Sequence, residues 1–212
     1  GECGQAWRVA YSFLNTLAGP FDFLDQNYPV PQHICEVTHG LIEDGRIKLD
    51  KSGNDHMTLT YHDSCNVARA SRMGDKPGGQ FTIPRDIIKA SCNNFYDMPE
   101  HSIKEGTFCC GGGGGLLTDD LIELRVKGAM PRMQALKEVT EQNGVTHMAA
   151  ICAICKSQFS KIFPYYNFEM DQIVSLHQLV SNAIVLTGQK SGESDDEDNE
   201  DSKDAETAAS LN

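Results

Sequence analysis

The sequence predicts an α/β fold in which helices cover both faces of a parallel sheet. Two observations lead to this prediction. Segments with the two-residue alternation of a strand take turns with segments of helical periodicity, and cysteines follow where two of the predicted strands end. Strands that alternate with helices form parallel sheets, because each crossover returns the chain to the same end of the sheet. In such folds the carboxyl edge of the strands is the usual place for a ligand.

The first fifty residues contain two helical patterns and one short strand pattern. Apolar residues in 1–17 recur at helical spacing. A strand is predicted over 34–38, followed by a short helix over 39–44. Turn-forming residues in 50–55 separate this part of the chain from the regular pattern that comes after it.

A regular alternation of elements begins at Met57. The segment 57–62 is rich in β-branched and aromatic residues and predicts a strand. Pro84 predicts the start of a helix, because a proline at the first helical position lacks only an N–H that would have no partner there. The segment 93–98 predicts the second strand of this part.

The glycine run 111–115 leads to the next predicted helix, with Thr118 in position to cap it. Pro131 predicts the end of that helix and the start of another, since proline cannot continue a helix without a kink. This second helix is expected to end at Gly144, because glycine readily takes the left-handed conformation that closes a helix.

The remaining elements follow one another closely. The patterns predict a strand over 146–151, a helix over 155–163, a strand over 170–175 and a closing helix over 176–186. The predicted strands after Met57 all alternate with helices, and this is the pattern that favours a parallel sheet.

Composition limits what kind of protein this is. The chain has 212 residues, of which 40% are hydrophobic and 23% charged, which is typical of a globular domain with appendages. Nine acidic residues and one lysine give the segment 191–212 a charge of −8 out of the total of −12. That segment cannot bury enough apolar surface to offset the entropy of ordering it, so we predict a disordered acidic tail. The body of the chain has no basic stripe, which argues against nucleic-acid binding.

Eight cysteines indicate either a disulfide-bonded secreted protein or a metal protein. No secretory signal peptide is visible. Cys109 and Cys110 are neighbours, and adjacent Cα atoms lie about 3.8 Å apart, below the roughly 4.4–6.8 Å that a disulfide normally spans. Two adjacent thiolates that face one metal centre need no such bridge. We therefore favour metal binding, and no apolar run is long enough to predict a membrane span.

Five cysteines form the candidate metal site, and they are Cys65, Cys109, Cys110, Cys152 and Cys155. Thiolates are the usual ligands of iron–sulfur clusters, and zinc with four of these sulfurs is the alternative. The glycines Gly111, Gly112 and Gly113 directly follow the cysteine pair. Without Cβ atoms their backbone can approach an anionic cluster closely and direct N–H groups at it.

Four motifs, in this order, resemble the cysteine-rich CCG domain of heterodisulfide reductase B and D subunits. They are Thr60-Tyr-His-Asp-Ser-Cys65, Pro84-Arg85, Cys109-Cys-Gly-Gly-Gly-Gly-Gly115 and Cys152-Ala-Ile-Cys155. The resemblance implies a complete CCG domain over 57–188 whose five cysteines hold a [4Fe–4S] cluster, of the non-cubane type, at the carboxyl edge of the strands. It also implies a degenerate first CCG repeat over 1–50, in which Cys3 lacks the second cysteine of its own motif.

The start of the chain, Gly-Glu-Cys-Gly-Gln-Ala-Trp-Arg, resembles DsrK-type subunits of DsrMKJOP complexes. This resemblance implies an oxidoreductase of sulfur metabolism that reduces or oxidises a disulfide or trisulfide on a DsrC-like sulfur-carrier protein. It also implies membrane-bound redox subunits as partners, a place on the cytoplasmic side of the inner membrane, and a longer protein of which this chain is the C-terminal part. Electron transfer in a lactate- or glycolate-oxidising complex is the alternative within the family, and a zinc-stabilised interaction module is the alternative outside it.

Several other residues are candidates for chemistry. His62 could donate a proton to a leaving thiolate, because an imidazole titrates near neutral pH. Its alternative role is to order the loop before Cys65. Cys3 could meet substrate sulfur. Arg85 is expected at a surface-exposed helix start, with contact to an anionic substrate as the alternative. Cys92 and Cys35 are expected to be buried thiols.

Overall fold

The computed structural model describes residues 32–115 and 117–186, and these contain a three-stranded parallel sheet. Its strands are β1 (Leu59–His62), β2 (His147–Ala150) and β3 (Ile173–Ser175), in the order β1-β2-β3. His62 lies opposite Ala150, which in turn lies opposite Ser175, so all three strands end at one edge. The predicted α/β fold with a parallel sheet is confirmed.

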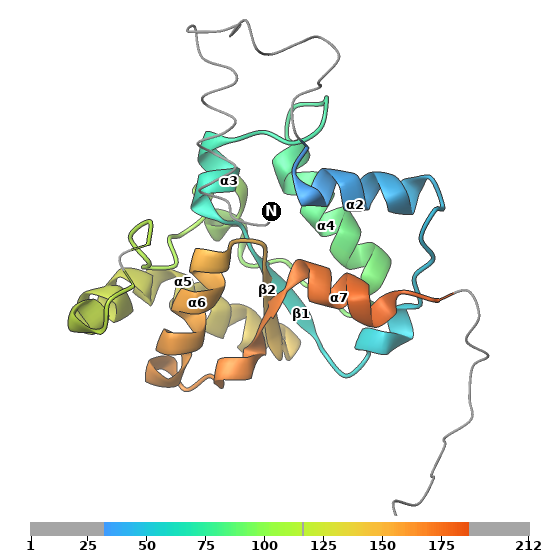
Figure 1. Ribbon diagram of the computed structural model, residues 1–212. Helices are drawn as coiled ribbons and strands as arrows, with labels where there is room; N and C mark the ends of the chain where they lie inside the picture. The colour runs from blue at the N-terminus through green and yellow to red at the C-terminus, as the bar shows by residue number, and fades with distance from the viewer. Residues whose placement is uncertain (1–31, 116, 187–212) are drawn as a thin grey trace, which may run out of the picture.

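Helices α2 (Ile34–Glu43), α4 (Gly79–Ser91) and α7 (Leu176–Ala183) cover one face of the sheet. They lie together on one side of β1 in Figure 1. Leu59 and Tyr61 point from β1 into the core that these helices close. Their burial follows from the two-residue period of a strand, which directs every second side chain to the same face.

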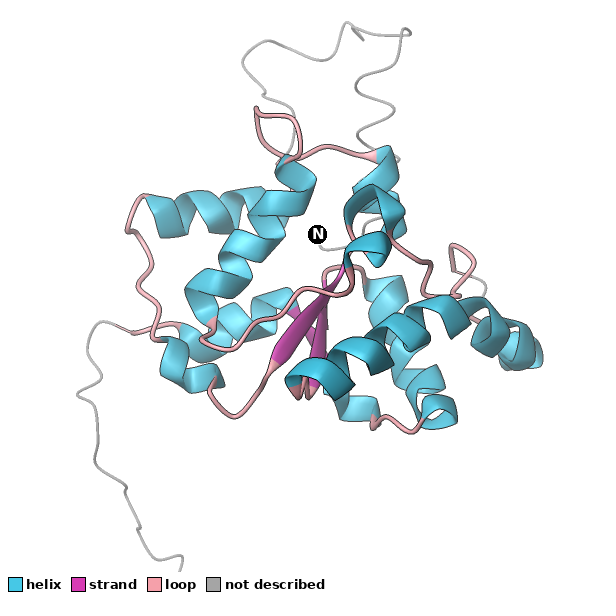
Figure 2. Cartoon of the chain, turned by 180° about the vertical axis from the view of Figure 1, so that it is seen from behind, coloured by secondary structure: helices cyan, strands magenta, loops and turns pink. Residues whose placement is uncertain are grey.

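Helices α5 (Ile122–Asn143) and α6 (Ala153–Ile162) cover the opposite face (Figure 2). Met148 of β2 points into this second core, where it packs with Met133 of α5 and Phe159 of α6. The short helix α3 (Cys65–Ala70) stands at the carboxyl edge of β1. Six short 3-10 turns complete the described elements, and they are 51–54, 100–102, 104–106, 119–121, 163–166 and 170–172.

The strand predicted over 34–38 is wrong, because these residues form the first half of α2. A capping box starts this helix: the His33 ring accepts a hydrogen bond from the backbone N–H of Cys35, and Glu36 accepts one from the backbone N–H of His33. Local capping bonds therefore outweigh the short β-branched pattern. Cys35 is fully buried in the core between α2 and the rest of the domain, and the partly buried Leu49 from the following loop packs against that core.

Both prolines that were expected to open helices lie inside longer ones. Pro84 is the sixth residue of α4, whose first turn already buries Phe81. Pro131 lies in the middle of α5, flanked by the buried Ala129 and Arg132. An interior proline costs about 3 kcal/mol or more, so buried side chains on both sides must offset that cost. The predicted end of α5 at Gly144, which has φ 66°, is confirmed.

The strand predicted over 93–98 is not formed in the described structure. The segment runs parallel to β1, but only Phe95 bridges to Leu59. Two backbone hydrogen bonds of 2.9 Å flank this bridge, from the N–H of Leu59 to Asn94 and from the N–H of Tyr96 to Leu59. The predicted cap at Thr118 is also wrong, because its side chain makes no capping bond and a 3-10 turn precedes α5.

The predicted disordered tail, 191–212, and the start of the predicted first repeat, 1–31, lie outside the described residues. The later part of that predicted repeat, 34–49, packs against α4 and shares its core. The division of the chain into a first repeat and a second domain stays a prediction. None of the helices described is long and apolar enough to cross a membrane.

Candidate metal centre

The ends of β1 and β2 bring three of the five candidate cysteines to one edge of the sheet. Cys65 opens α3, three residues after the end of β1. Cys152 is the N-cap of α6, two residues after the end of β2, and Cys155 lies in the first turn of that helix. Because β1 and β2 are paired and parallel, these two ends are neighbours. The loop before α5 adds Cys109 and Cys110 to the same place.

The five thiols form a continuous string of neighbouring sulfurs. Cys109 interacts with Cys65 on one side and with Cys110 on the other. Cys155 connects Cys110 to Cys152. Over the described residues, no group of three or more Cys, His, Asp or Glu side chains is arranged to hold a metal ion. A string of five sulfurs is suited to a cluster with several metal positions better than to one ion.

One thiol in this string is strongly acidic. Hydrogen bonds from the thiols of Cys110 and Cys65 lower the pKa of Cys109 to about 2, and the backbone N–H of Gly111 adds a further bond of 3.3 Å to its sulfur. The same hydrogen bond to Cys109 raises the pKa of Cys110 to about 12 and raises that of Cys65 well above its usual value. Without metal, Cys109 is thus the thiolate of the group, and it is exposed.

The glycine run that follows the cysteine pair is a defined turn rather than a linker. Gly111 has φ 81°, and a Cβ atom there would lie 2.4 Å from the carbonyl oxygen of Arg125 and 2.8 Å from the nitrogen of Ala129. Only glycine allows the α5 backbone to approach so closely. The contact fixes the cysteine pair against α5, and the N–H of Gly111 donates a hydrogen bond to the sulfur of Cys109. Contact of the glycine N–H groups with a cluster stays a prediction.

Three polar side chains on one face of β1 and its extension lack hydrogen-bond partners. Thr60, His62 and Ser64 are spaced two residues apart, and the oxygen or both ring nitrogens of each are buried without a partner over the described residues. Buried polar groups normally have partners, because an unsatisfied one costs about 1–3 kcal/mol. Their position just before Cys65 fits a site that receives a polar or anionic group, such as a thiolate-bound metal cluster.

His62 has a neutral ring at neutral pH. Burial lowers its pKa well below the usual value, and the positive charge of Arg132 lowers it further. The ring packs edge-on against Phe159 with 4.9 Å between the centroids, and it lies within electrostatic range of Cys109. A neutral imidazole can donate one hydrogen bond but is a poor proton donor. The catalytic role of His62 therefore stays a prediction, and the geometry favours hydrogen bonding.

Residues 59–160 match the sequence profile of the cysteine-rich CCG family. The matched segment contains all five cysteines that meet at the sheet edge.

The chain carries a cysteine-rich CCG domain.

Similar proteins carry names from redox metabolism. The chain is 38% identical over 213 aligned positions to the "Hdr-like menaquinol oxidoreductase iron-sulfur subunit" of Archaeoglobus profundus. The alignment covers 88% of this chain and 37% of that protein. It is 34% identical over 105 positions to one of the subunits of the dihydromethanophenazine:CoB--CoM heterodisulfide reductase of Methanosarcina mazei, covering 46% of this chain and 23% of that protein. It is 34% identical over 89 positions to the "EtfAB:quinone oxidoreductase" of Syntrophomonas wolfei, covering 42% of this chain and 11% of that protein. The chain thus spans little more than a third of the length of the Archaeoglobus relative.

A buried ion-pair network holds the loop that carries Cys109 and Cys110, called the cysteine loop below, against β1. Arg85 binds Asp63 through two hydrogen bonds of 2.9 and 2.7 Å and also binds Asp97. Asp63 accepts a further bond from the backbone N–H of Lys104, and its carbonyl oxygen accepts one from the hydroxyl of Thr107. The network joins α4, the end of β1 and the loop before Cys109. The expectation that Arg85 is a surface residue is wrong, because it is 6% exposed.

Two other cysteines of the described chain stand apart from the site. Cys35 and Cys92 are buried in the core on the other face of the sheet. Burial raises the pKa of Cys92 to about 12, as expected for a thiol that packs as a small apolar side chain. The prediction for both is confirmed. Cys3, the remaining candidate for contact with substrate sulfur, lies outside the described residues.

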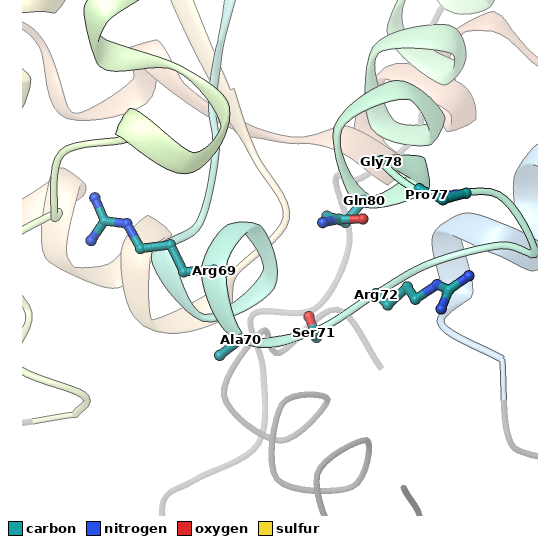
Figure 3. Close-up of a pocket in the computed structure, with 7 residues that line it drawn as sticks. All are labelled: Arg69, Ala70, Ser71, Arg72, Pro77, Gly78 and Gln80. Atoms are coloured by element: carbon teal, nitrogen blue, oxygen red, sulfur yellow. The ribbon is translucent and has the colours of Figure 1, made fainter.

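A pocket of about 420 Å³ lies between the end of α3 and the start of α4 (Figure 3). Arg69 and Arg72 line it, and their side chains extend away from each other. Arg69 donates hydrogen bonds to the carbonyl oxygens of Glu105 and Thr107, so it ties α3 to the cysteine loop.

Sequence reasoning missed two residues beside the site. Arg125 and Arg132 of α5 are 3% and 0% exposed, although arginine is almost never fully buried without a partner. Their spacing of seven residues puts them on one face of a helix and was a usable signal. It was hidden by the expectation that the helix breaks at Pro131.

Proposed function

We propose that Cys65, Cys109, Cys110, Cys152 and Cys155 hold an iron–sulfur cluster, of the non-cubane [4Fe–4S] type, and that the protein is a heterodisulfide-reductase-like oxidoreductase. The meeting of all five cysteines of a CCG domain at the carboxyl edge of the sheet is the observation that carries this proposal. The names of its relatives, which include an iron–sulfur subunit and a heterodisulfide reductase, support it.

The reaction that we propose is the interconversion of a sulfur–sulfur bond and two thiols. Reduction takes two electrons and two protons, breaks the S–S bond and leaves one proton on each sulfur; oxidation is the reverse. The cluster would supply or accept the electrons. Substrate sulfur would reach the site from the side of Cys109, which is exposed, because Cys110, Cys152 and Cys155 are buried.

His62 contributes a hydrogen bond rather than a proton in this proposal. Its neutral ring lies buried near Cys109 with both nitrogens free of protein partners over the described residues. The N–H can stabilise negative charge on a sulfur at the site, since hydrogen bonds to cluster sulfurs help set the reduction potential. The protons of the reaction then come from solvent at the exposed side. The N–H groups of Gly111, Gly112 and Gly113 would contribute in the same way.

We further propose a DsrC-like protein disulfide or trisulfide as substrate and membrane-bound redox subunits of a DsrMKJOP-like complex as partners. The menaquinol in the name of the Archaeoglobus relative supports a link to a quinone pool and a place on the inner face of the membrane through those partners. The exposed Cys109 supports a large, protein-bound substrate, because no deep channel is needed to reach it.

A second candidate is electron transfer without sulfur–sulfur chemistry. The similarity to an EtfAB:quinone oxidoreductase favours it, because that name contains no sulfur substrate. A lactate- or glycolate-oxidising complex would use the domain in this way. The two candidates predict the same cluster and different substrates, so a disulfide-reduction assay separates them.

The first test is metal content. The protein is purified without oxygen, its iron, sulfide and zinc are measured, and an EPR spectrum is taken after mild oxidation. We expect iron and sulfide in equal amounts, lost in Cys109→Ala and Cys152→Ala but kept in Cys92→Ala. One zinc per chain without sulfide would reject the proposal and leave a structural module. Iron and sulfide without reduction of a disulfide would leave the electron-transfer candidate.

A further inference from the structure

Helix α5 presents two buried arginines to the cysteine loop. Arg125 and Arg132 are seven residues apart and therefore lie on one face of the helix, two turns from each other. Arg125 lies beside Gly111, just after the cysteine pair, because a Cβ atom on that glycine would meet the Arg125 carbonyl oxygen. Arg132 lies beside Phe108, just before the pair. The two arginines thus flank Cys109 and Cys110.

Arg132 has hydrogen-bond partners but no carboxylate. Its guanidinium donates to the carbonyl oxygen of Ser102 at 2.6 Å and to the hydroxyl of Thr107 at 2.7 Å. The central carbon (Cζ) of the guanidinium lies 5.8 Å from the centre of the Phe108 ring. Within the described part of the chain, no ion pair to it is found within 4.0 Å. Burial lowers the pKa of Arg132 to about 10, so the side chain is still charged at neutral pH.

Arg125 is in a similar position. It donates to the side-chain oxygen of Gln158 at 2.8 Å and to the carbonyl oxygen of Thr118 at 3.1 Å. The carboxylate of Asp119 is 3.8 Å away, but Asp119 is 84% exposed. An ion pair to such an exposed, solvated group is weak.

The described interior therefore has an excess of positive charge. Three guanidiniums are buried, those of Arg85, Arg125 and Arg132, against one buried carboxylate, that of Asp63. Asp63 already receives two hydrogen bonds from Arg85, which also binds the 33% exposed Asp97. The pair on α5 is left without a buried counter-ion of its own. Buried charges are costly unless they are paired, so a fixed anion is expected beside this pair.

The groups near Arg132 that are anionic, or become anionic as metal ligands, are Asp63, which is already paired with Arg85, and the cysteines of the site. Cys155 and Cys110 lie within electrostatic range of Arg132 and become negatively charged as metal ligands. The loop that carries Cys109 and Cys110 contacts both arginines, Arg125 through its backbone. An iron–sulfur cluster on thiolate ligands is an anion, and each added electron makes it more negative. Fixed positive charge at low dielectric favours that electron, because Coulomb energies are larger there than in water.

We propose that Arg125 and Arg132 are the built-in counter-charge of the cluster, and that they favour its reduced state. This inference rests on the proposed function, because it requires the cluster. The arginines are positioning residues that act through charge, and neither is proposed as a ligand or as a contact of the substrate. Net charge and hydrogen bonding are among the protein's means of setting a cluster potential.

The test is a redox titration of the loaded protein, followed by EPR. Arg132→Gln removes the charge and Arg132→Lys keeps it. Arg46→Gln is the control, because it removes an exposed charge in the loop after α2. At a fixed solution potential we expect the ratio of reduced to oxidised cluster to fall on the order of tenfold in Arg132→Gln. The ratio should change little in Arg132→Lys and in Arg46→Gln.

The outcomes separate this inference from the proposed function. A wild-type protein without iron and sulfide overturns both. A loaded Arg132→Gln with the wild-type ratio overturns the inference alone. If Arg132→Gln takes up no iron while Arg132→Lys does, the need for the charge is supported directly. If neither Arg132 variant takes up iron, Arg125→Gln is measured instead. A lower ratio of reduced to oxidised cluster in Arg125→Gln supports the inference. A wild-type ratio overturns it, and so does a failure of both Arg125→Gln and Arg125→Lys to take up iron.

Discussion

A single methyl group tests how the cysteine loop is held. Gly111→Ala adds a Cβ atom at a residue with φ 81°, where it would lie 2.4 Å from one backbone atom of α5 and 2.8 Å from another. Gly144→Ala is the matched control, because Gly144 has φ 66° and open space around the added atom. Both variants force alanine into a left-handed conformation, so the difference between them isolates the close approach of the two backbones.

The magnitudes follow from these two effects. A left-handed conformation costs an alanine roughly 1–2 kcal/mol, which is the whole expected loss for Gly144→Ala. The overlap at Gly111 involves backbone atoms of Arg125 and Ala129, which cannot rotate away. Relieving this overlap requires a shift of the packed helix α5, which adds about 1–3 kcal/mol to the loss of stability. Gly111→Ala should therefore lose roughly 2–5 kcal/mol in total, a large part of the stability of an ordinary domain.

Urea unfolding of the metal-free protein, kept reduced and followed by circular dichroism, measures both losses. Equal slopes of the free energy against urea would show that the variants unfold from comparable states. Iron uptake is measured in parallel, and we expect it to fall in Gly111→Ala and to persist in Gly144→Ala. Equal losses of stability in the two variants would refute the close contact between the glycine loop and α5.

Three further predictions concern the buried network and the thiols. Arg85→Met should destabilise the protein by about 3–5 kcal/mol in urea unfolding, because it leaves the carboxylate of Asp63 buried without its partner. In the metal-free protein Cys109 should be alkylated first by iodoacetamide, at a rate almost independent of pH between about 6 and 9, because its lowered pKa keeps it a thiolate where an ordinary thiol is mostly protonated. Cys152→Ala should abolish iron binding, whereas Cys92→Ala should leave it unchanged and lower stability only modestly, since that buried thiol lies in the other core.

Each of these has its own control. Arg46→Met changes an exposed arginine and should stay within about 0.5 kcal/mol of the wild type. A loss as small as this for Arg85→Met would contradict the buried network. Mass spectrometry of the alkylated protein identifies the labelled cysteine, and a rate that rises tenfold per pH unit would contradict an acidic Cys109. Loss of iron in Cys92→Ala would contradict the division of the cysteines into site and core.

Local patterns predicted the sheet well. The strands that became β1, β2 and β3 were recognised because each is short, β-branched or apolar, and bounded by turns. The convergence of Cys65 and Cys152 followed from the geometry of parallel strands, whose carboxyl ends share an edge. The position of the cysteine pair came from the resemblance to a known domain, since a loop of this kind has no periodicity that fixes where it folds back.

The errors have a common physical cause, which is that tertiary packing outweighed a local signal. Pro84 and Pro131 normally end or open helices, but buried neighbours on both sides hold α4 and α5 together through them. The segment 93–98 has strand-like residues, yet it forms one bridge with β1 instead of a full pairing. The burial of Arg85 could not be seen because its partners, Asp63 and Asp97, are distant in sequence.

The exposure of Cys109 also determines how the metal-free protein is oxidised in air. A solvent-accessible thiolate is the first sulfur that peroxide converts to a sulfenic acid. The thiol of Cys65, its hydrogen-bond neighbour, can then displace water from that acid and close a disulfide between α3 and the cysteine loop. In a chain with this disulfide, two of the five candidate ligand sulfurs cannot bind metal. The disulfide must be reduced before the cluster can be assembled. Shelter from oxygen, or a partner that covers this side, is therefore a condition for assembling the site.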